Sequence, residues 1–360
     1  MQGSALIAMS GGVDSTVAAM LTLNDGLDCV GSAMKLSRSI PAGADDAEAN
    51  ARAAAEHLGI PFCVFDFSDR FDEMVIKKFI RSYRDGRTPN PCIDCNRHLK
   101  YGLFLDKARE MGKDCIVTGH YARIERGADG RCLLKKGADN SKDQSYVLYS
   151  LSQEQLSFIR LPLGGLSKPE VRELALGAGF GNALKGESQD ICFVPDGNYA
   201  DFIEEYTGEQ PRKGRFIDFD GNDLGENGGI LRYTIGQRRG LGLAMPYPPY
   251  VLEIRPQDDT VVVGKNDMLY SRSLYARDIN LIPFDRLDKP IRARAKIRYN
   301  QKEQPATVTQ IDEDALHIVF DEPQRAITMG QAAVIYDGDI VIGGGTIVPN
   351  DVCERQGIMD

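Results

Sequence analysis

The chain has 360 residues and a formal net charge of -9, a length that indicates roughly two or three domains with apolar cores. No run of about eighteen apolar residues is present to span a membrane, and the opening MQGSALIAMS does not resemble a secretion signal. The eight scattered cysteines are too few for a secreted disulfide scaffold. We therefore expect a cytoplasmic protein with no membrane partner.

The first half of the sequence alternates short apolar runs with helical segments. Strands are predicted at residues 5–10, 29–36, 61–67 and 114–121, and helices at 13–23, 45–59, 71–83 and 97–112. Because strands separated by helices of this length pair in parallel, the pattern predicts an α/β domain with a doubly wound parallel sheet. Segment 87–96, RTPNPCIDCN, contains two prolines and is predicted to be a loop.

Two helix starts near the end of this domain carry a capping-box pattern. Ser152 is followed by Gln155, and Ser167 is followed by Glu170 with Pro169 in the first turn. Both patterns predict short helices that close the α/β domain.

The pattern changes after about residue 200, where short β-rich runs replace the helical segments. Asp220-Gly221 and Asp337-Gly338 are typical of hairpin turns between such strands. We expect three domains, at 1–200, 201–272 and 273–360. The first is α/β, the second is small and β-rich, and the third is a small antiparallel β-barrel.

A glycine-rich hexapeptide, SGGVDS at 10–15, lies directly after the first strand and directly before the first helix. Gly11 and Gly12 allow a tight turn, and the N–H groups at the helix start favour a bound anion. The loop lacks the lysine of G-x-x-x-x-G-K-[ST] and the spacing of G-x-G-x-x-G, so it predicts neither a kinase-type NTPase nor a dinucleotide site. SGGVDS resembles the signature of the ATP pyrophosphatase (PP-loop) superfamily, whose members split ATP between the α- and β-phosphates and adenylate an acceptor oxygen.

Three cysteines stand apart from the strand-like apolar runs: Cys92, Cys95 and Cys192. Cys92 and Cys95 form a single C-x-x-C, which is weak evidence for zinc because no second pair has matching spacing. Cys192 follows Glu187 and Asp190, and acids near a thiol raise its pKa. From the residues alone, a catalytic Cys192 and a quiet one are equally supported.

The charge is unevenly distributed along the chain. Residues 77–100 carry seven Lys or Arg and two acids, and residues 286–302 carry seven Lys or Arg and one acid. Such stretches could hold a phosphate backbone or could be solvated faces, and charge alone does not decide between them.

Longer motifs occur in one order after SGGVDS: TPNPCIDCNRHLKYG (88–102), TGHYARI (118–124), KDQSYVLYSL (142–151), GESQDICFV (186–194), YTIGQRRGLG (233–242) and IRYNQ (297–301). Together they resemble the bacterial and organellar tRNA-specific 2-thiouridylase family over nearly the whole chain. The resemblance implies that ATP with Mg²⁺ adenylates the C2 oxygen of the wobble uridine, which a cysteine persulfide then replaces with sulfur. Cys192 would carry the persulfide, and Cys95 would attack it to free sulfide or to close a disulfide.

The resemblance also implies binding residues. ATP would be held in the first domain by Ala8, Met9, Ser10, Gly11, Gly12, Val13, Asp14, Ser15, Met34 and Gly119. The tRNA would be contacted by Asn90, Pro91, Cys92, His120, Lys142, Asp143, Gln144, Arg298, Tyr299 and Gln331, the last three from the barrel. An upstream sulfur donor, such as a cysteine desulfurase or a sulfur-relay protein, is also implied.

One position departs from the family pattern. Many members have an aspartate, assigned as a general base, where this chain has Cys92. We carry the base role to no residue, because Asp94 would point to the opposite side of an extended segment. Cys92 is thus an additional candidate thiol, and Cys92, Cys95 and Cys192 together could hold an iron–sulfur cluster that binds sulfide. We favour the persulfide route over this cluster and predict no other metal site.

Two other functions remain open. One is a different PP-loop ATP pyrophosphatase that adenylates a small-molecule acceptor, and the other is a non-catalytic RNA-binding or sulfur-carrying protein. In a thiouridylase tRNA should stimulate pyrophosphate release, whereas a small acceptor should do so in the first alternative. Background ATP turnover despite bound tRNA would favour the second.

Overall fold

The computed structural model describes residues 3–36, 45–181, 191–194 and 197–350. A five-stranded parallel sheet consists of β1 (Ser4–Ala8), β2 (Asp28–Lys35), β3 (Phe62–Asp66), β4 (Cys115–Val117) and β7 (Ile159–Arg160) in the order β3-β2-β1-β4-β7. The chain therefore winds outwards from β1 to β3 and then continues on the other side of β1. This order confirms the predicted doubly wound domain, and such sheets bind ligands at the carboxyl ends of the strands where the order reverses.

Alternate residues of β1 point to opposite faces of the sheet, and each face has its own core. Ala5 and Ile7 share one core with the helices on their face, which are α1 (Val13–Asn24), α2 (Asp45–Leu58) and α8 (Lys168–Gly177). Leu6 and Ala8 share the other with α3 (Ser68–Phe71), the π-helix η1 (Asp72–Ile76), α4 (Lys77–Arg84), the π-helix η2 (Cys95–Leu103) and α6 (Phe104–Glu110). Because both faces are covered, the strands are continuous apolar runs.

The prediction of a loop over the whole of 87–96 is wrong, because a helix begins inside it. α5 (Pro91–Asp94) runs directly into η2. Asn90 caps this helix: its Oδ1 accepts a hydrogen bond from the Cys92 N–H at 3.2 Å, and Pro91 occupies the first turn. Proline at a helix start loses no helical hydrogen bond, so Asn-Pro marks a beginning here and not a break. Cys92, Asp94 and Cys95 therefore lie on a helix and not on an extended segment.

Both predicted capping boxes are confirmed. At α7 (Gln153–Ser157), the Gln155 N–H donates to Ser152 Oγ at 3.2 Å, and the Ser152 N–H donates to Gln155 Oε1 at 2.9 Å. At α8, the Glu170 carboxylate accepts a hydrogen bond from the Ser167 N–H at 2.7 Å. The 3-10 helix η3 (Ser145–Leu148) precedes α7, and α9 (Tyr199–Thr207) leads out of the α/β region.

A hairpin from the first half of the chain joins the C-terminal sheet. β5 (Ala122–Arg126) and β6 (Cys132–Lys136) pair antiparallel, and Lys135 of β6 pairs with Ile340 of the last strand. The Arg123 guanidinium also bonds to the Asp339 carboxylate at 2.7 Å. The α/β domain and the C-terminal domain are thus joined by backbone pairing and an ion pair.

The central region is a four-stranded sheet of β8 (Gly214–Asp218), β9 (Asp223–Asn227), β10 (Tyr250–Arg255) and β11 (Thr260–Gly264) in the order β10-β11-β8-β9. Its separate core includes Phe216, Tyr233 and Val251. The hairpin predicted at Asp220-Gly221 is confirmed, since it joins the antiparallel strands β8 and β9. The 3-10 helices η4 (Ile230–Arg232) and η5 (Asn266–Leu269) flank this sheet.

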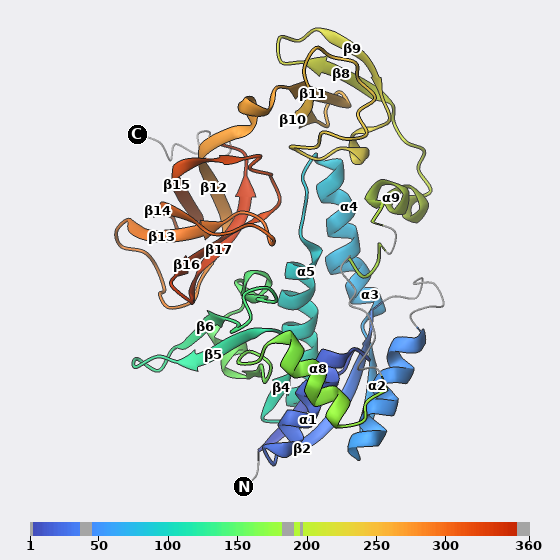
Figure 1. Ribbon diagram of the computed structural model, residues 1–360, viewed down its shortest axis with the longest axis vertical. Coiled ribbons are helices and arrows are strands. Elements are labelled where there is room, and N and C mark those ends of the chain that lie inside the picture. Colours follow the sequence, from blue (N-terminus) through green and yellow to red (C-terminus); the bar gives the residue numbers. More distant parts are fainter. Residues whose placement is uncertain (1–2, 37–44, 182–190, 195–196, 351–360) are drawn as a thin grey trace.

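The last strands form the predicted antiparallel barrel. They are β12 (Tyr270–Leu281), β13 (Ile291–Lys296), β14 (Gln304–Asp312), β15 (Ala315–Arg325), β16 (Ala332–Asp337) and β17 (Ile340–Val348). The order β12-β15-β14-β13-β16-β17 closes through pairing of β12 with β17, and the Asp337-Gly338 hairpin joins β16 and β17. Figure 1 shows the parallel sheet at one end of the molecule, the central sheet at the other, and the barrel beside them.

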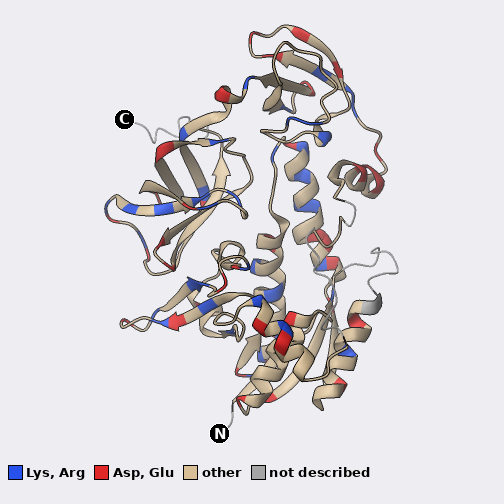
Figure 2. Cartoon of the chain, viewed as in Figure 1, with Lys and Arg blue, Asp and Glu red and all other residues tan. Residues whose placement is uncertain are grey.

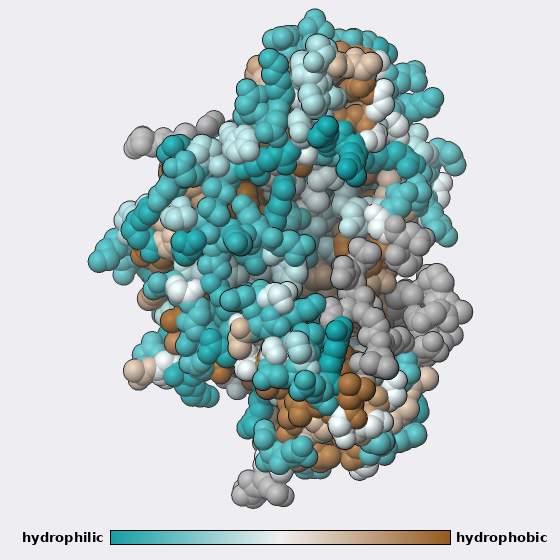
Figure 3. Space-filling view, viewed as in Figure 1, coloured by the Kyte–Doolittle hydropathy of each residue, from teal (hydrophilic) through white to brown (hydrophobic). Residues whose placement is uncertain are grey.

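The viewed surface is largely hydrophilic over the barrel and the central sheet, and its apolar side chains gather over the α/β domain (Figure 3). No helix within the described residues is long and apolar enough to cross a membrane.

Candidate active site

The hexapeptide at 10–15 forms the turn between β1 and α1 at the carboxyl edge of the parallel sheet. Gly11 has a φ of +74°, and a Cβ atom there would lie 2.3 Å from the Ala47 carbonyl oxygen, so glycine is required. Ser15 Oγ closes the turn by accepting from the Ser10 N–H at 3.1 Å and donating to the Gly12 carbonyl at 3.0 Å. This preformed turn at a helix N-terminus is suited to hold phosphate groups.

The end of β4 contacts this turn at Gly119. A Cβ atom at Gly119 would lie 2.8 Å from the Asp14 carbonyl carbon and 2.9 Å from the Ser15 nitrogen, so a larger residue would separate β4 from the start of α1. Among the other residues predicted to hold ATP, Ala8, Met9 and Val13 are buried at the turn. Met34, near the end of β2, is half-buried. The structure therefore brings the predicted ATP residues together at the ends of β1, β2 and β4.

Two residues that the sequence analysis did not single out hold the Asp14 carboxylate. Lys168 Nζ lies 2.7 Å from Asp14 Oδ1 and 2.8 Å from Oδ2, and Tyr121 Oη donates to Oδ1 at 2.7 Å. Lys168 belongs to the capping segment SKPE, which sequence analysis interpreted only as a helix start. No local signal links it to a loop 154 residues earlier.

The three candidate thiols come together from two segments. Cys92 lies on α5 and Cys95 begins η2, whereas Cys192 lies in 191–194; Glu187 and Asp190 lie outside the described residues. Desolvation is the largest cause of the raised pKa of Cys95 and of Cys192. Smaller contributions come from charge on Cys192 and Cys92 at Cys95, and from charge on Cys92 at Cys192, so the three thiols are neighbours. All seven described cysteines are free thiols.

Every one of these thiols is held in its protonated form. Burial raises the pKa of Cys95 to about 12, and Cys95 is 8% exposed. Cys92 and Cys192 are solvent-exposed residues, yet the protein mass around their sulfur atoms raises the pKa of both by desolvation. Since a thiolate is the nucleophile, the site needs a positive charge or a bound substrate to activate these groups.

Lys100 supplies a positive charge beside the thiols. Its charge lowers the pKa of Cys92, Cys95 and Cys192, although in each case desolvation is the larger effect. η2 is a π-helix, in which the Phe104 N–H bonds to the carbonyl five residues earlier. Cys95 and Lys100 are also five residues apart, and the wider π-helical turn brings them nearer to one side of the helix than an α-helical turn would.

The wide turn of η2 is stabilised by α7. Gln155 Nε2 donates to the Arg97 carbonyl at 3.2 Å and to the Tyr101 carbonyl at 2.7 Å, and both carbonyls belong to η2. The Arg97 guanidinium also bonds to the Asp278 carboxylate on the barrel at 2.7 Å. π-helical turns are frequent at functional sites, and this one is held by contacts from two other elements.

His120, predicted to contact tRNA, is buried in a hydrogen-bonded cluster. Its Nδ1 lies 2.8 Å from both Tyr101 Oη and Thr118 Oγ1, and its exposed fraction is 9%. Burial lowers the pKa of His120 well below its usual value, so the imidazole is neutral near pH 7. The structure therefore places His120 beneath the surface next to the loop formed at the end of β4.

The segment predicted to contact tRNA at 142–144 lies beside Tyr121, whose hydroxyl bonds to Asp14. Asp143 Oδ1 accepts from the Gly137 N–H at 3.0 Å and from the Ser145 N–H at 3.1 Å. Gln144 Oε1 accepts from the Tyr121 N–H at 3.0 Å. The Asp143 and Gln144 side chains thus order their own loop, while Lys142 is half-buried beside them.

The barrel docks on the segment that leads into α5. Gln331 Nε2 donates to the Thr88 carbonyl at 2.7 Å, and the Thr88 N–H donates to the Met329 carbonyl at 2.9 Å. Arg298 Nη2 bonds to Thr328 Oγ1 at 3.1 Å, in the same barrel turn. These contacts bring Gln331 and Arg298 towards Asn90, Pro91 and the thiols of α5 and η2.

Tyr299 is a barrel residue that lies near the thiols. Burial and, to a smaller extent, charge on Asp143 and on Cys92 raise the pKa of Tyr299 to about 12. Lys296 Nζ lies 5.5 Å from the centre of the Tyr299 ring and 5.6 Å from that of Tyr146. Lys and Arg residues also recur along α4 and along β13 (Figure 2). Lys296 of β13 thus lies beside Tyr299, a predicted tRNA residue of the barrel.

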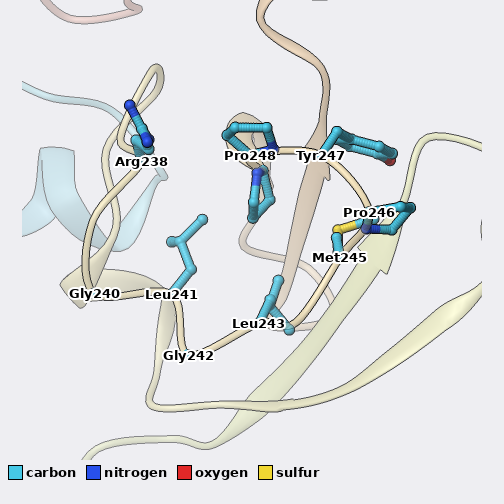
Figure 4. A pocket seen from close by; sticks show the side chains of 10 residues that line it. Arg238, Gly240, Leu241, Gly242, Leu243, Met245, Pro246, Tyr247 and Pro248 are labelled. Atoms are coloured by element: carbon cyan, nitrogen blue, oxygen red, sulfur yellow. The ribbon is translucent and has the colours of Figure 1, made fainter.

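Within the described residues, no three His, Cys, Asp or Glu side chains are arranged to hold a metal ion. A separate open cleft of about 450 Å³ lies in the central region between Arg238 and Pro249 (Figure 4), and none of the candidate site residues lines it.

Comparisons with known proteins cover nearly all of the chain. Residues 4–196 match the family described as tRNA methyl transferase HUP domain, residues 200–265 its PRC-barrel domain, and residues 271–347 the aminomethyltransferase beta-barrel domain. The chain is 48% identical to "tRNA-specific 2-thiouridylase MnmA" of Clostridioides difficile, covering 96% of this chain and 98% of that protein. It is 47% identical to the protein of that name from Carboxydothermus hydrogenoformans, covering 95% and 96%.

Proposed function

The chain belongs to the tRNA-specific 2-thiouridylase family, and we propose that it uses ATP to replace the C2 oxygen of the wobble uridine in tRNA with sulfur. The observation that carries this proposal is the identity of 43–48% to proteins of that name over 95–96% of the chain. The family binds ATP and acts on tRNA. Adenylation of a small-molecule acceptor is not favoured, because it needs neither the thiols nor the docked barrel.

The reaction divides into two steps. The C2 oxygen attacks the α-phosphate of ATP, releasing pyrophosphate and turning a poor leaving group into adenylate. The terminal sulfur of a persulfide on Cys192 then attacks C2, and the C–O bond breaks to release AMP. Cys95 attacks the Cys192 sulfur, so that the persulfide S–S bond breaks, the outer sulfur stays on C2, and a Cys95–Cys192 disulfide forms. An external reductant and the sulfur donor must restore the persulfide.

We assign residue roles on this basis. The turn at 10–15 with Ala8, Met9, Met34 and Gly119 binds Mg²⁺-ATP, and the backbone N–H groups at the start of α1 face the pyrophosphate portion. Asn90 and Pro91 lie beside the target base, which is splayed out of the anticodon loop. Arg298, Tyr299 and Gln331 contact the tRNA from the barrel, and Cys92 and residues 142–144 line the approach. His120 is buried against Tyr101 and Thr118 and supports this surface from within.

Two broader assignments accompany this one. The chain divides functionally at 1–200, 201–272 and 273–360 into an ATP-binding catalytic domain, a connecting domain and a tRNA-contacting barrel. Cys192 receives its sulfur from a cysteine desulfurase or a sulfur-relay protein. The exposed Cys192 side chain supports direct transfer from such a donor.

The proposal is tested by anaerobic incubation of the protein with ATP, unmodified tRNA, cysteine and a cysteine desulfurase, which supplies persulfide sulfur to Cys192, followed by digestion and mass spectrometry for 2-thiouridine. Product that requires ATP and disappears in Cys192→Ser and Cys95→Ser supports the persulfide route. Cys132→Ser, at a buried cysteine outside the thiol group, is the matched control and should retain product. Pyrophosphate release stimulated by a small acceptor but not by tRNA would overturn the proposal.

A further inference from the structure

The nucleotide loop contains no lysine of its own, yet a buried lysine from a distant helix lies against it. Lys168 is the first residue of α8 and is 5% exposed. Its Nζ bonds to both carboxylate oxygens of Asp14, at 2.7 and 2.8 Å. Asp14 is in the first turn of α1, two residues after Gly12.

Several contacts hold Lys168 in this position. The Lys168 N–H donates to Asp139 Oδ2 at 3.0 Å, and the Ser167–Glu170 capping contact fixes the start of α8. Lys168 Nζ also lies 5.8 Å from the centre of the Tyr121 ring, whose hydroxyl bonds to the same Asp14 carboxylate. α8 itself packs in the core that contains α1. The ammonium group is therefore fixed and not a mobile surface charge.

Only one partner of this ion pair is buried, because the Lys168 side chain is 7% exposed and the Asp14 side chain is 33% exposed. The cost of removing the ammonium group from water offsets part of the attraction, so the pair is weak evidence for a purely stabilising role. The positive end of α1 is what suits the loop to hold phosphate, and a carboxylate in the first turn opposes a bound polyanion. A cation that bonds to both carboxylate oxygens cancels that repulsion.

We propose that Lys168 is a positioning residue for the adenylation step, which neutralises and orients Asp14 so that the loop can hold the pyrophosphate portion of ATP. This rests on the proposed ATP-dependent function. Lys168 acts through Asp14: it keeps the carboxylate turned towards α8 and Tyr121, and it leaves the N–H groups of the turn available to the phosphates. The chain thereby supplies from α8 the positive charge that other phosphate loops carry in their own sequence.

The test is the affinity of the folded protein for inorganic pyrophosphate, measured by calorimetry in the presence of EDTA. In Lys168→Met the unbalanced Asp14 charge should weaken pyrophosphate binding on the order of tenfold. The difference in affinity from wild type should grow as the salt concentration is lowered, because less of the repulsion is screened. In Asp14→Asn/Lys168→Met the charge is balanced again, and affinity should return to within about threefold of wild type. Because this assay needs neither tRNA nor sulfur transfer, its failure is distinguishable from failure of the proposed function.

A matched control lies at the opposite edge of the same sheet. Lys113 Nζ bonds to Asp28 Oδ2 at 2.6 Å, and its side chain is 10% exposed. Lys113→Met should leave pyrophosphate affinity unchanged, and thermal unfolding reports whether each variant is folded. If Lys168→Met does not fold, the double variant and Lys168→Arg carry the test. A folded Lys168→Met that binds pyrophosphate as wild type does, or a double variant with affinity more than about tenfold below wild type, would overturn the proposal.

Discussion

The nucleotide loop and the cysteine group differ in how far each is prepared for its chemistry. In the loop, Gly11 has the required backbone conformation, Ser15 closes the turn, and Asp14 is held by two side chains. In the cysteine group all three thiols are protonated, because desolvation raises the pKa of each. One region is complete without its ligand, and the other needs activation.

The two regions also differ in how the chain builds them. The loop comes from one hexapeptide between adjacent elements. The cysteine group is assembled from α5, η2 and residues 191–194, with the barrel docked at Thr88. The turn of the nucleotide loop is therefore closed by residues 10–15 themselves, whereas the cysteine group depends on contacts between distant segments.

The largest effect is expected at Gly11. In Gly11→Ala the added Cβ would meet the Ala47 carbonyl oxygen at 2.3 Å at a φ of +74°, so ATP affinity should fall at least about 100-fold. Gly177→Ala is the control, because nothing lies within 4 Å of its added Cβ. Cys192→Ser should bind ATP as wild type does while forming no 2-thiouridine. Calorimetry measures the ATP affinity of Gly11→Ala and of Cys192→Ser. Normal ATP affinity in Gly11→Ala would contradict the preformed loop.

A second effect concerns the stability of the folded protein at high pH, to which the buried Cys95 thiol contributes. Burial raises the pKa of Cys95 from 9.0 to about 12, so the folded state holds this proton more tightly than the unfolded state. The associated stability is present below pH 9 and is lost as pH rises from about 9 to about 12. Between about pH 8 and pH 11, wild type should lose about 2 kcal/mol more unfolding free energy than Cys95→Ser. If urea unfolding gave both proteins the same change in unfolding free energy across this pH range, the burial of the thiol would be contradicted.

A third effect concerns Lys100. Because its charge lowers the pKa of the three thiols, Lys100→Met should raise those pKa values further and move the alkylation profile to higher pH. Near pH 8 the iodoacetamide reaction of Cys92 and Cys192 should slow about fivefold, while ATP affinity stays unchanged. Lys100→Arg keeps the charge and should restore most of the rate. Identical pH profiles for wild type and Lys100→Met would show that the Lys100 charge does not lower the pKa of these thiols.

The smallest effect is expected at the barrel contact. Gln331→Ala removes the 2.7 Å bond to the Thr88 carbonyl, which should reduce stability by about 1 kcal/mol and tRNA affinity about threefold. Gln304→Ala, whose Nε2 bonds only within its own strand region to Lys302, is the matched control. Filter binding of tRNA compares the two. Equal tRNA affinity in both variants would argue against a role for the docked barrel in holding the tRNA.

The sequence predicted those parts that depend on neighbouring residues. Strand–helix alternation predicted the parallel sheet, and the two capping boxes and the hairpins at Asp220 and Asp337 were confirmed. The helix start at Pro91 was missed because proline was interpreted only as a breaker, although Asn90 before it is a favoured cap. That error placed Cys92 and Cys95 in a loop.

What the sequence did not predict depends on contacts across long separations. The bond between Lys168 and Asp14 joins residues 154 apart, and that between Gln331 and Thr88 joins residues 243 apart. The carbonyl groups of Arg97 and Tyr101 in the π-helical turn are bonded by Gln155, more than fifty residues away, and no local motif encodes these contacts. Burial of His120 by Tyr101 and Thr118 likewise follows only from the folded chain.

The most direct test of the central claim follows the oxygen that leaves the uridine. A tRNA carrying ¹⁸O at C2 of the wobble uridine would be incubated with the persulfide-loaded protein and ATP, and the AMP would be analysed by mass spectrometry. Adenylation of C2 predicts one ¹⁸O atom in each AMP for each 2-thiouridine formed. Unlabelled AMP with the label retained in tRNA or released to water would contradict the reaction proposed for this chain.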